Sequence, residues 1–225
     1  YYELASGAEI QTYFERLMRE RFLPSGRVEY FPMCEYTDNG SFTSLLSGET
    51  QSVEVRRKVV DATFFNTSVP STRTPKYEIA DGVKLIAPNS LPTEVAAHSR
   101  YTIIGGGKTA MDVAMWLLQN GAKPGSIRWV VPRDSWLINR ETTQPGDAFH
   151  NRFIGAKAAQ LESCANATSI AGLFDLLEQS GQLLRIDKSI TPTMYHGATI
   201  AQAEIDALGT IRNVIRKGHV QQIGL

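Results

Sequence analysis

The sequence predicts an α/β fold with a Rossmann-type dinucleotide-binding βαβ unit, a β-meander and a helical C-terminal region. Three observations predict it. A β-branched run at Tyr101–Ile104 leads directly into three glycines at 105–107. Apolar residues then keep helical spacing until Asn120-Gly121, and a second buried strand is expected at Ile127–Val131. Strand, glycine turn, helix and strand together make one βαβ unit.

Residues 1–70 predict a helix followed by a three-stranded meander. Ser6 and Glu9 have capping-box spacing, and the helix that they begin is expected to end near Pro24. Turn signals at 38–40 and 47–48 then separate short β-like runs. These runs are Val28–Met33, Phe42–Leu46 and Val53–Ala62.

Beyond residue 70, the sequence divides into three further regions. Four prolines between 70 and 92 predict a linker over 71–100 and a domain boundary there. The nucleotide-binding unit follows at 101–145. Residues 146–225 are expected to be mostly helical, with helices at 156–167, at 170–179 and after Thr199, where Gln202 completes a second capping box. A hairpin of 212–215 and 219–223 is expected to close the chain. Because the chain begins abruptly at Tyr1 and the hairpin's second strand has barely begun at the end, we expect a fragment.

Composition excludes several classes of function. The 225 residues include 23 Lys plus Arg and 23 Asp plus Glu, so no basic excess favours nucleic-acid binding. No apolar run approaches the roughly 18 residues that span a bilayer, and no signal peptide precedes the first helix, so we expect a soluble, cytoplasmic protein. The two cysteines, Cys34 and Cys164, and the four histidines have no metal-ligand spacing. No metal site is therefore expected, and a dithiol redox centre is excluded.

The glycine turn fits a dinucleotide fingerprint, Gly105-x-Gly107-x-x-Ala110. Gly105 would make the tight turn, Gly107 would let backbone N–H groups approach a pyrophosphate, and Ala110 would allow close helix–strand packing. The pyrophosphate would lie at the helix N-terminus. The expected cofactor-binding residues are Gly105, Gly106, Gly107, Lys108, Thr109, Ala110 and Arg133.

A nucleoside-triphosphate phosphate loop is the alternative for this turn, because Gly107-Lys108-Thr109 matches the end of such a loop. The position of its first glycine holds Thr102, inside the predicted strand. The loop that remains is too short to wrap a triphosphate.

The end of the second strand distinguishes the two nicotinamide cofactors. Arginine there accommodates a 2′-phosphate, whereas a carboxylate binds the ribose hydroxyl. Arg133 favours NADPH, and Asp134 leaves NADH as the alternative. A further alternative is that Arg133 and Arg140 are solvated loop charges.

The segments 101–112 and 128–140 resemble the NADP-binding segment of flavin-containing-monooxygenase-like and pyridine-nucleotide oxidoreductase-like flavoproteins. The resemblance implies two nested dinucleotide domains, one for FAD and one for NAD(P)H. Val59–Thr63 resembles the strand that leads out of the FAD domain, although Phe64 replaces the usual glycine. The N-terminal FAD fingerprint and the His-Ser pair of the monooxygenases are absent from this sequence.

The sequence therefore predicts the NAD(P)H-binding part of an FAD-dependent oxidoreductase, in which hydride passes from NADPH to flavin and a small-molecule substrate is oxidised. The cofactors would be NADP(H) and FAD, and the chain alone would have little turnover. No catalytic side chain is predicted. Two lesser expectations are a loop at Met194–His196 near substrate and Trp136 either beside the adenine or packed on the sheet. The alternative function is a non-catalytic NAD(P)-binding or sensing module.

Overall fold

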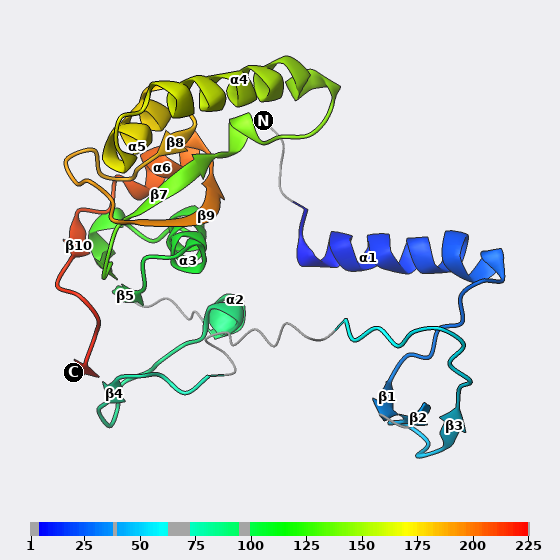
Figure 1. Cartoon of the computed structure of the whole chain (residues 1–225). Coiled ribbons are helices and arrows are strands. Elements are labelled where there is room, and N and C mark those ends of the chain that lie inside the picture. Colours follow the sequence, from blue (N-terminus) through cyan, green and yellow to red (C-terminus); the bar gives the residue numbers. More distant parts are fainter. Residues whose placement is uncertain (1–4, 38–39, 63–72, 95–99, 225) are drawn as a thin grey trace. The chain divides into compact units, whose positions relative to one another are not determined.

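The computed structural model describes residues 5–37, 40–62, 73–94 and 100–224, and its elements are mixed α and β (Figure 1). The chain forms two compact units, Tyr1–Asn66 and Thr67–Leu225. None of the described helices is long and apolar enough to cross a membrane.

The first unit begins with helix α1, Gly7–Leu17. The Ser6 side chain accepts a hydrogen bond from the Glu9 backbone N–H, and the Glu9 carboxylate accepts one from the Ser6 N–H at 2.7 Å. The latter hydrogen bond holds the pKa of Glu9 below its usual value. A π-helical turn, η1 at Met18–Phe22, and a 3-10 turn, η2 at Leu23–Ser25, complete the helix. The predicted capping box and the helix end near Pro24 are confirmed.

The meander of the first unit is an antiparallel sheet in the order β1-β2-β3, with strands at Cys34–Thr37, Ser41–Ser44 and Thr50–Ser52. Two strand positions predicted from sequence are wrong. Val28–Met33 is not a strand, because Pro32 has no N–H to donate and Met33 takes a positive φ of 54°. The third strand stops at Ser52 because Ser52 already pairs with the first residue of β2, Ser41. Residues 53–62 therefore have no strand to pair with, and the exit strand expected at 59–63 does not form over 59–62; Thr63 lies outside the described residues.

The second unit is built on a parallel sheet in the order β10-β6-β5. Its strands are β5 at Tyr101–Ile104, β6 at Ile127–Val130 and β10 at Asn213–Ile215. Helix α3, Lys108–Gln119, connects β5 to β6, and the 3-10 turn η4, Pro124–Ser126, lies between α3 and β6. The predicted succession of strand, glycine turn, helix and strand is confirmed.

A second sheet was not predicted. Its order is β8-β7-β9, with β7 at Ser135–Asn139, β8 at Leu183–Leu184 and β9 at Met194–Ile200. The register between β7 and β9 shifts by two residues, from Trp136↔Tyr195 to Ile138↔Thr199, and Gly197 takes a φ of 68° within this bulge. The bulge breaks the two-residue alternation by which a strand is recognised in a sequence. This is why the sequence predicts a loop at Met194–His196, which lies at the start of β9.

Three helices cross the C-terminal region: α4 at His150–Asn166, α5 at Ile170–Gln179 and α6 at Gln202–Leu208. Figure 1 shows α4 and α5 side by side next to β8. Helix α5 has its predicted bounds, and α4 begins six residues earlier than predicted, after the 3-10 turns η5 at Arg140–Thr142 and η6 at Asp147–Phe149. The Thr199–Gln202 capping box is wrong, because Thr199 belongs to β9 and it is the Glu204 carboxylate that accepts the Ala201 N–H at 2.8 Å.

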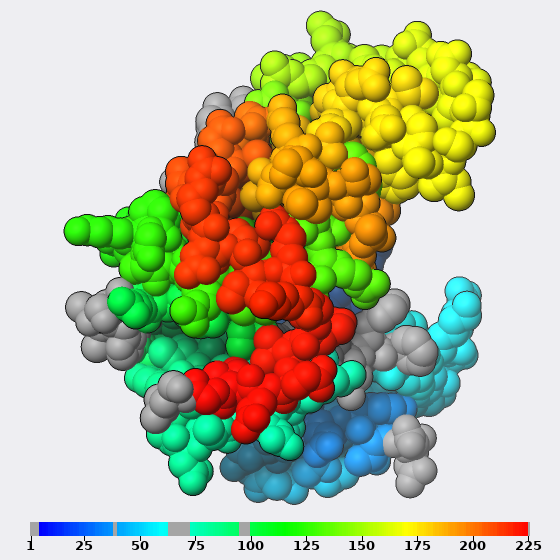
Figure 2. Space-filling model, turned by 90° about the vertical axis from the view of Figure 1, so that its left-hand side faces the viewer, coloured from blue at the N-terminus to red at the C-terminus, as the bar shows by residue number. Residues whose placement is uncertain are grey.

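The region expected as a linker contains β4 at Glu78–Ile79, the 3-10 turn η3 at Pro88–Ser90 and the short helix α2 at Leu91–Glu94. Strand β11, Gln222–Ile223, pairs with β4 in parallel. The predicted C-terminal hairpin is therefore wrong: β10 joins the central sheet, and a turn at Gly218, with a φ of 83°, leads the chain on to β4. Figure 2 shows this C-terminal segment, in red, crossing the face of the unit.

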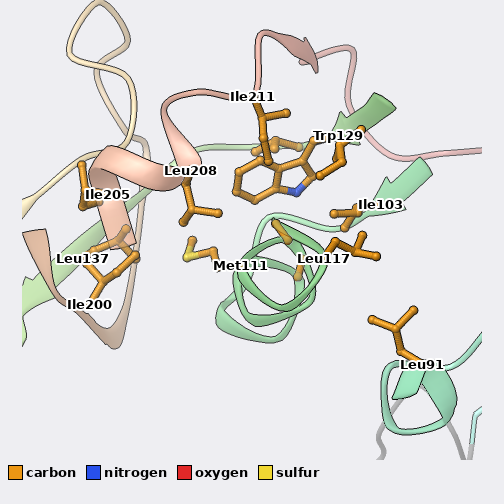
Figure 3. Packing of buried hydrophobic residues seen from close by; sticks show 14 residues of the cluster. Leu91, Ile103, Met111, Leu117, Trp129, Leu137, Ile200, Ile205, Leu208 and Ile211 are labelled. Carbon is orange, nitrogen blue, oxygen red and sulfur yellow. The ribbon is translucent and has the colours of Figure 1, made fainter. Parts of the chain in front are cut away.

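One apolar core joins the two three-stranded sheets of this unit (Figure 3). Trp129 of β6 lies at its centre, 1% exposed, and Met111 and Leu117 of α3 pack there. Leu137 of β7 and Ile200 of β9, from the second sheet, belong to the same core. Ile205 and Leu208 of α6 and Ile211 after it also belong to this core. The core thus fixes β7 and β9 relative to the glycine turn between β5 and α3.

A half-buried ion cluster lies beside this core. The Glu204 carboxylate of α6 forms an ion pair with Arg140 at 2.9 Å and lies 3.3 Å from the Lys108 ammonium, which also pairs with Asp112. The Arg140 and Glu204 side chains are only 10% and 13% exposed. Arg140 is therefore not a solvated loop charge, and Glu204 ties α6 to the first residue of α3.

Replacing Glu204 by Ala should lower the free energy of unfolding by about 3 kcal/mol, because Arg140 then stays poorly solvated without a partner. Asp206→Ala, on the exposed side of the same helix, should change it by less than about 0.5 kcal/mol. Urea denaturation of both variants checks this. Equal stability of the two variants would show that the cluster contributes little.

Candidate functional site

A cleft of about 1260 Å³ runs along the whole of β5 and reaches the edge of the sheet at which the carboxyl ends of β5 and β6 lie. Ligands of open parallel α/β sheets bind at this edge. Six of the predicted binding residues line the cleft: Gly105, Gly106, Gly107, Thr109, Ala110 and Arg133. Residues between 73 and 91, Met194 and His196 of β9, and residues 219–221 form other parts of its wall.

The three glycines of the turn differ in what surrounds them. Gly105 has a φ of 129°, which residues with a side chain rarely adopt. A Cβ on Gly106 would lie 2.9 Å from the Arg133 carbonyl oxygen and 3.0 Å from a Val131 methyl carbon. A Cβ on Gly107 would meet nothing within 4 Å. Gly105 thus permits the turn, Gly106 lets it pack against the end of β6, and Gly107 leaves open space at the start of α3.

Two hydrogen bonds hold Gly105 in place. The buried Trp129 indole donates to the Gly105 carbonyl at 2.8 Å, and the Gly105 N–H donates to the Val130 carbonyl at 2.9 Å. Both partners belong to β6, so the turn after β5 is attached to the neighbouring strand. The sequence prediction missed Trp129; its signal is a tryptophan within a buried strand, since a buried indole N–H usually needs an acceptor.

The first turn of α3 presents unpaired backbone donors. Among the described residues, none accepts a hydrogen bond from the backbone N–H groups of 106–109. Gly107 is the N-cap and carries no side chain to satisfy them. Because this helix has 12 residues, its dipole adds positive potential at the same point. The turn can therefore donate several hydrogen bonds to one anion.

Charge in the cleft is strongly one-sided. Among the described residues that line it, none is Asp or Glu and five are basic: Arg73, Lys76, Lys84, Arg100 and Arg133. The chain as a whole has equal numbers of acidic and basic residues. Such a lining favours a ligand with several negative charges.

The two predicted cationic ligands lie in different settings. Arg133 is exposed, and no ion pair of the described residues involves it. Its guanidinium is free to bind phosphate oxygens in a fork. Lys108, in contrast, pairs with Asp112 and Glu204 and is not among the cleft-lining residues. Lys108 therefore brings its backbone N–H to the turn, while its ammonium contributes to the ion cluster.

Asp134, which would bind the ribose 2′-hydroxyl in the NADH alternative, is paired with an arginine. Arg216, which follows β10, donates to both Asp134 carboxylate oxygens, at 2.7 and 3.1 Å.

Trp136 is 3% exposed and packs on Phe174, with ring centroids 5.6 Å apart, rather than lining the cleft. Among the described residues, no group of three or more His, Cys, Asp or Glu side chains is placed to share a metal ion.

Comparison with known proteins gives relatives without an assigned function. No family model matches the chain, and no solved structure matches it. Uncharacterized proteins of Mycobacterium bovis and of two strains of Mycobacterium tuberculosis are each 47% identical to it over 221 residues. The match covers 98% of this chain and 41% of each relative, so the chain spans less than half of their length. A functional argument therefore depends on the site itself.

Trp129→Phe keeps an aromatic ring but removes the hydrogen bond to Gly105, so it should lower the free energy of unfolding by about 1–3 kcal/mol. Trp136→Phe is the matched control, because Trp136 is also buried and its indole N–H donates a hydrogen bond to none of the described residues. Chemical denaturation measures both. If the two variants lose the same stability, the indole hydrogen bond is not what holds the turn.

Proposed function

We propose that the chain binds NADP(H) in this cleft, as the nicotinamide-nucleotide-binding part of an FAD-dependent oxidoreductase. One observation carries the proposal. The N–H groups of residues 106–109, unpaired among the described residues, open onto a cleft lined by cations and free of carboxylates among its described residues. A dinucleotide carries its charge on a pyrophosphate, which is the anion such a turn accommodates.

The pyrophosphate lies at the start of α3 in this proposal. The open space around Gly107 allows phosphate oxygens to reach the backbone, and the N–H groups of 106–109 donate to them. Helix and turn approach closely at Ala110, whose small side chain permits this: a Cβ on Gly105 would lie 3.7 Å from the Ala110 Cβ. These features favour the Rossmann-type interpretation over a triphosphate loop, since only three residues separate β5 from α3.

Arg133 would bind the 2′-phosphate of the adenosine ribose. It follows β6, where this group lies in dinucleotide-binding units, and no carboxylate of the described residues forms an ion pair with its guanidinium. The packing of Gly106 against the Arg133 backbone holds the Cα of this arginine close to the turn. One nucleotide can therefore contact both.

The oxidoreductase assignment rests on the resemblance in the segments 101–112 and 128–140. Bound nicotinamide supplies a hydride to an acceptor. The chain's own residues bind and orient the nucleotide. The resemblance of 59–63 to the exit strand of an FAD domain has no support over 59–62, because these residues form no strand; Thr63 lies outside the described residues. FAD therefore enters the proposal through the resemblance alone.

A non-catalytic NAD(P)-binding module is the second candidate function. It is favoured by one observation: every feature assigned to the cleft serves binding, and no side chain in it is assigned a chemical step. Flavin absorbance in the purified protein and NADPH oxidation by it, measured at 340 nm, separate the two. A colourless protein that binds NADPH without oxidising it supports the module.

Arg133→Ala should weaken NADPH binding about tenfold or more and leave NADH binding nearly unchanged, because only NADPH carries the 2′-phosphate. Titration calorimetry with both nucleotides measures this. Arg128→Ala, an exposed arginine near the other end of β6, is the charge-matched control. If the wild-type chain binds neither nucleotide, the proposed function is wrong.

Gly107→Ala and Gly106→Ala should separate binding from folding. A methyl group on Gly107 meets no protein atom but occupies the space of the pyrophosphate, so nucleotide affinity should fall about tenfold while the melting temperature hardly changes. A methyl group on Gly106 forces the end of β6 to move, so the melting temperature itself should fall. Unchanged affinity in Gly107→Ala would place the ligand elsewhere.

A further inference from the structure

Arg133 and Asp134 are adjacent in sequence but face different surroundings. Arg133 lines the large cleft. Asp134 is not among the described residues lining it; instead it borders a small cavity behind the glycine turn, together with Gly106, Trp129 and Arg216. Within one step of the chain, a cation therefore faces the proposed ligand and a carboxylate faces the protein.

Arg216 accounts for this placement. Its Nε and Nη2 atoms donate to the two Asp134 oxygens at 2.7 and 3.1 Å, which is the bidentate geometry of a strong guanidinium–carboxylate pair. The Asp134 side chain is 14% exposed and that of Arg216 27%, so solvent screens the pair only partly. Donating these hydrogen bonds to Asp134 raises the pKa of Arg216 above its already high value. Arg216 is thus a permanent counter-charge for Asp134.

Arg216 is itself held from its other side. Its Nη2 lies 3.3 Å from a carboxylate oxygen of Asp187, in the segment after β8. Hydrogen bonds from the Ser189 hydroxyl and backbone N–H hold the pKa of Asp187 below its usual value, so this carboxylate stays ionised. Arg216 follows β10, the strand beside β6, so three segments far apart in sequence fix one guanidinium behind the turn.

We propose that Arg216 determines the cofactor preference of the cleft: by binding both oxygens of Asp134, it removes the carboxylate that would read a ribose 2′-hydroxyl and leaves Arg133 to meet a 2′-phosphate. An unpaired carboxylate at the end of the second strand favours NADH, both by accepting the hydroxyl and by repelling a phosphate. Arg216 acts through Asp134 and need not touch the nucleotide. This inference rests on the proposed function, because it assumes that the cleft takes a nicotinamide dinucleotide.

Arg216→Met tests the proposal through the ratio of two affinities. Titration calorimetry of the whole chain with NADPH and with NADH should show that NADPH binding weakens about tenfold while NADH binding holds or improves, because the freed Asp134 charge then lies beside the 2′ position. Arg216→Met combined with Asp134→Asn should restore the preference for NADPH, since the residue next to Arg133 is then uncharged while Asp187 has lost Arg216 in both the single and the double variant. Arg128→Met removes an arginine charge away from the cleft and should leave the ratio unchanged.

The outcomes separate this inference from the function on which it rests. If the wild-type chain binds neither nucleotide, the proposed function fails and the inference with it. If the wild-type chain prefers NADPH and Arg216→Met keeps that ratio, the function stands and the inference is overturned. Asp134→Asn alone tests the same point even where Arg216→Met does not fold: it should keep or increase the preference for NADPH, and a shift toward NADH would overturn the inference.

Discussion

The hydrogen bond from the Trp129 indole to the Gly105 carbonyl is the constraint on which the cleft depends. A glycine turn has few conformational restraints of its own, and holding it in one shape costs backbone entropy. Trp129 supplies the restraint from within the core, where the indole is 1% exposed and held by packing on all sides. The conformation of the turn is therefore tied to the packing of the core, and the donors at the start of α3 are oriented before any ligand arrives.

The second sheet and the ion cluster extend this restraint across the unit. Leu137 and Ile200 share the core with Trp129, and Glu204 links α6 to Lys108 at the start of α3. The region after residue 146 is thus part of the scaffold around the cleft. Its strand β9 also supplies cleft-lining residues, Met194 and His196.

The sequence predicts best where structure depends on local signals. The β5–α3–β6 unit follows from hydrophobic periodicity and glycine placement, and the α1 capping box from two residues three positions apart. Prediction fails where the partner is distant: β10 and β11 look like a hairpin by themselves, yet each pairs with a strand more than 80 positions away. Six of the seven predicted site residues line one cleft because they follow adjacent strands. The ion pairs of Lys108 and Asp134, with partners 96 and 82 positions away, have no local signal.

The pairing of β4 with β11 has a consequence for how a ligand reaches the cleft. This parallel pair has only two residues on each strand, and segments beside it, near Tyr77 and Gln221, line the cleft. Because so few hydrogen bonds hold this pair together, separating β4 from β11 costs little free energy and leaves the central sheet intact. Entry and release of a large ligand can then proceed by local unfolding of this wall. A bound ligand that contacts both segments would slow amide exchange at β4 and β11 far more than at β5 and β6 of the central sheet.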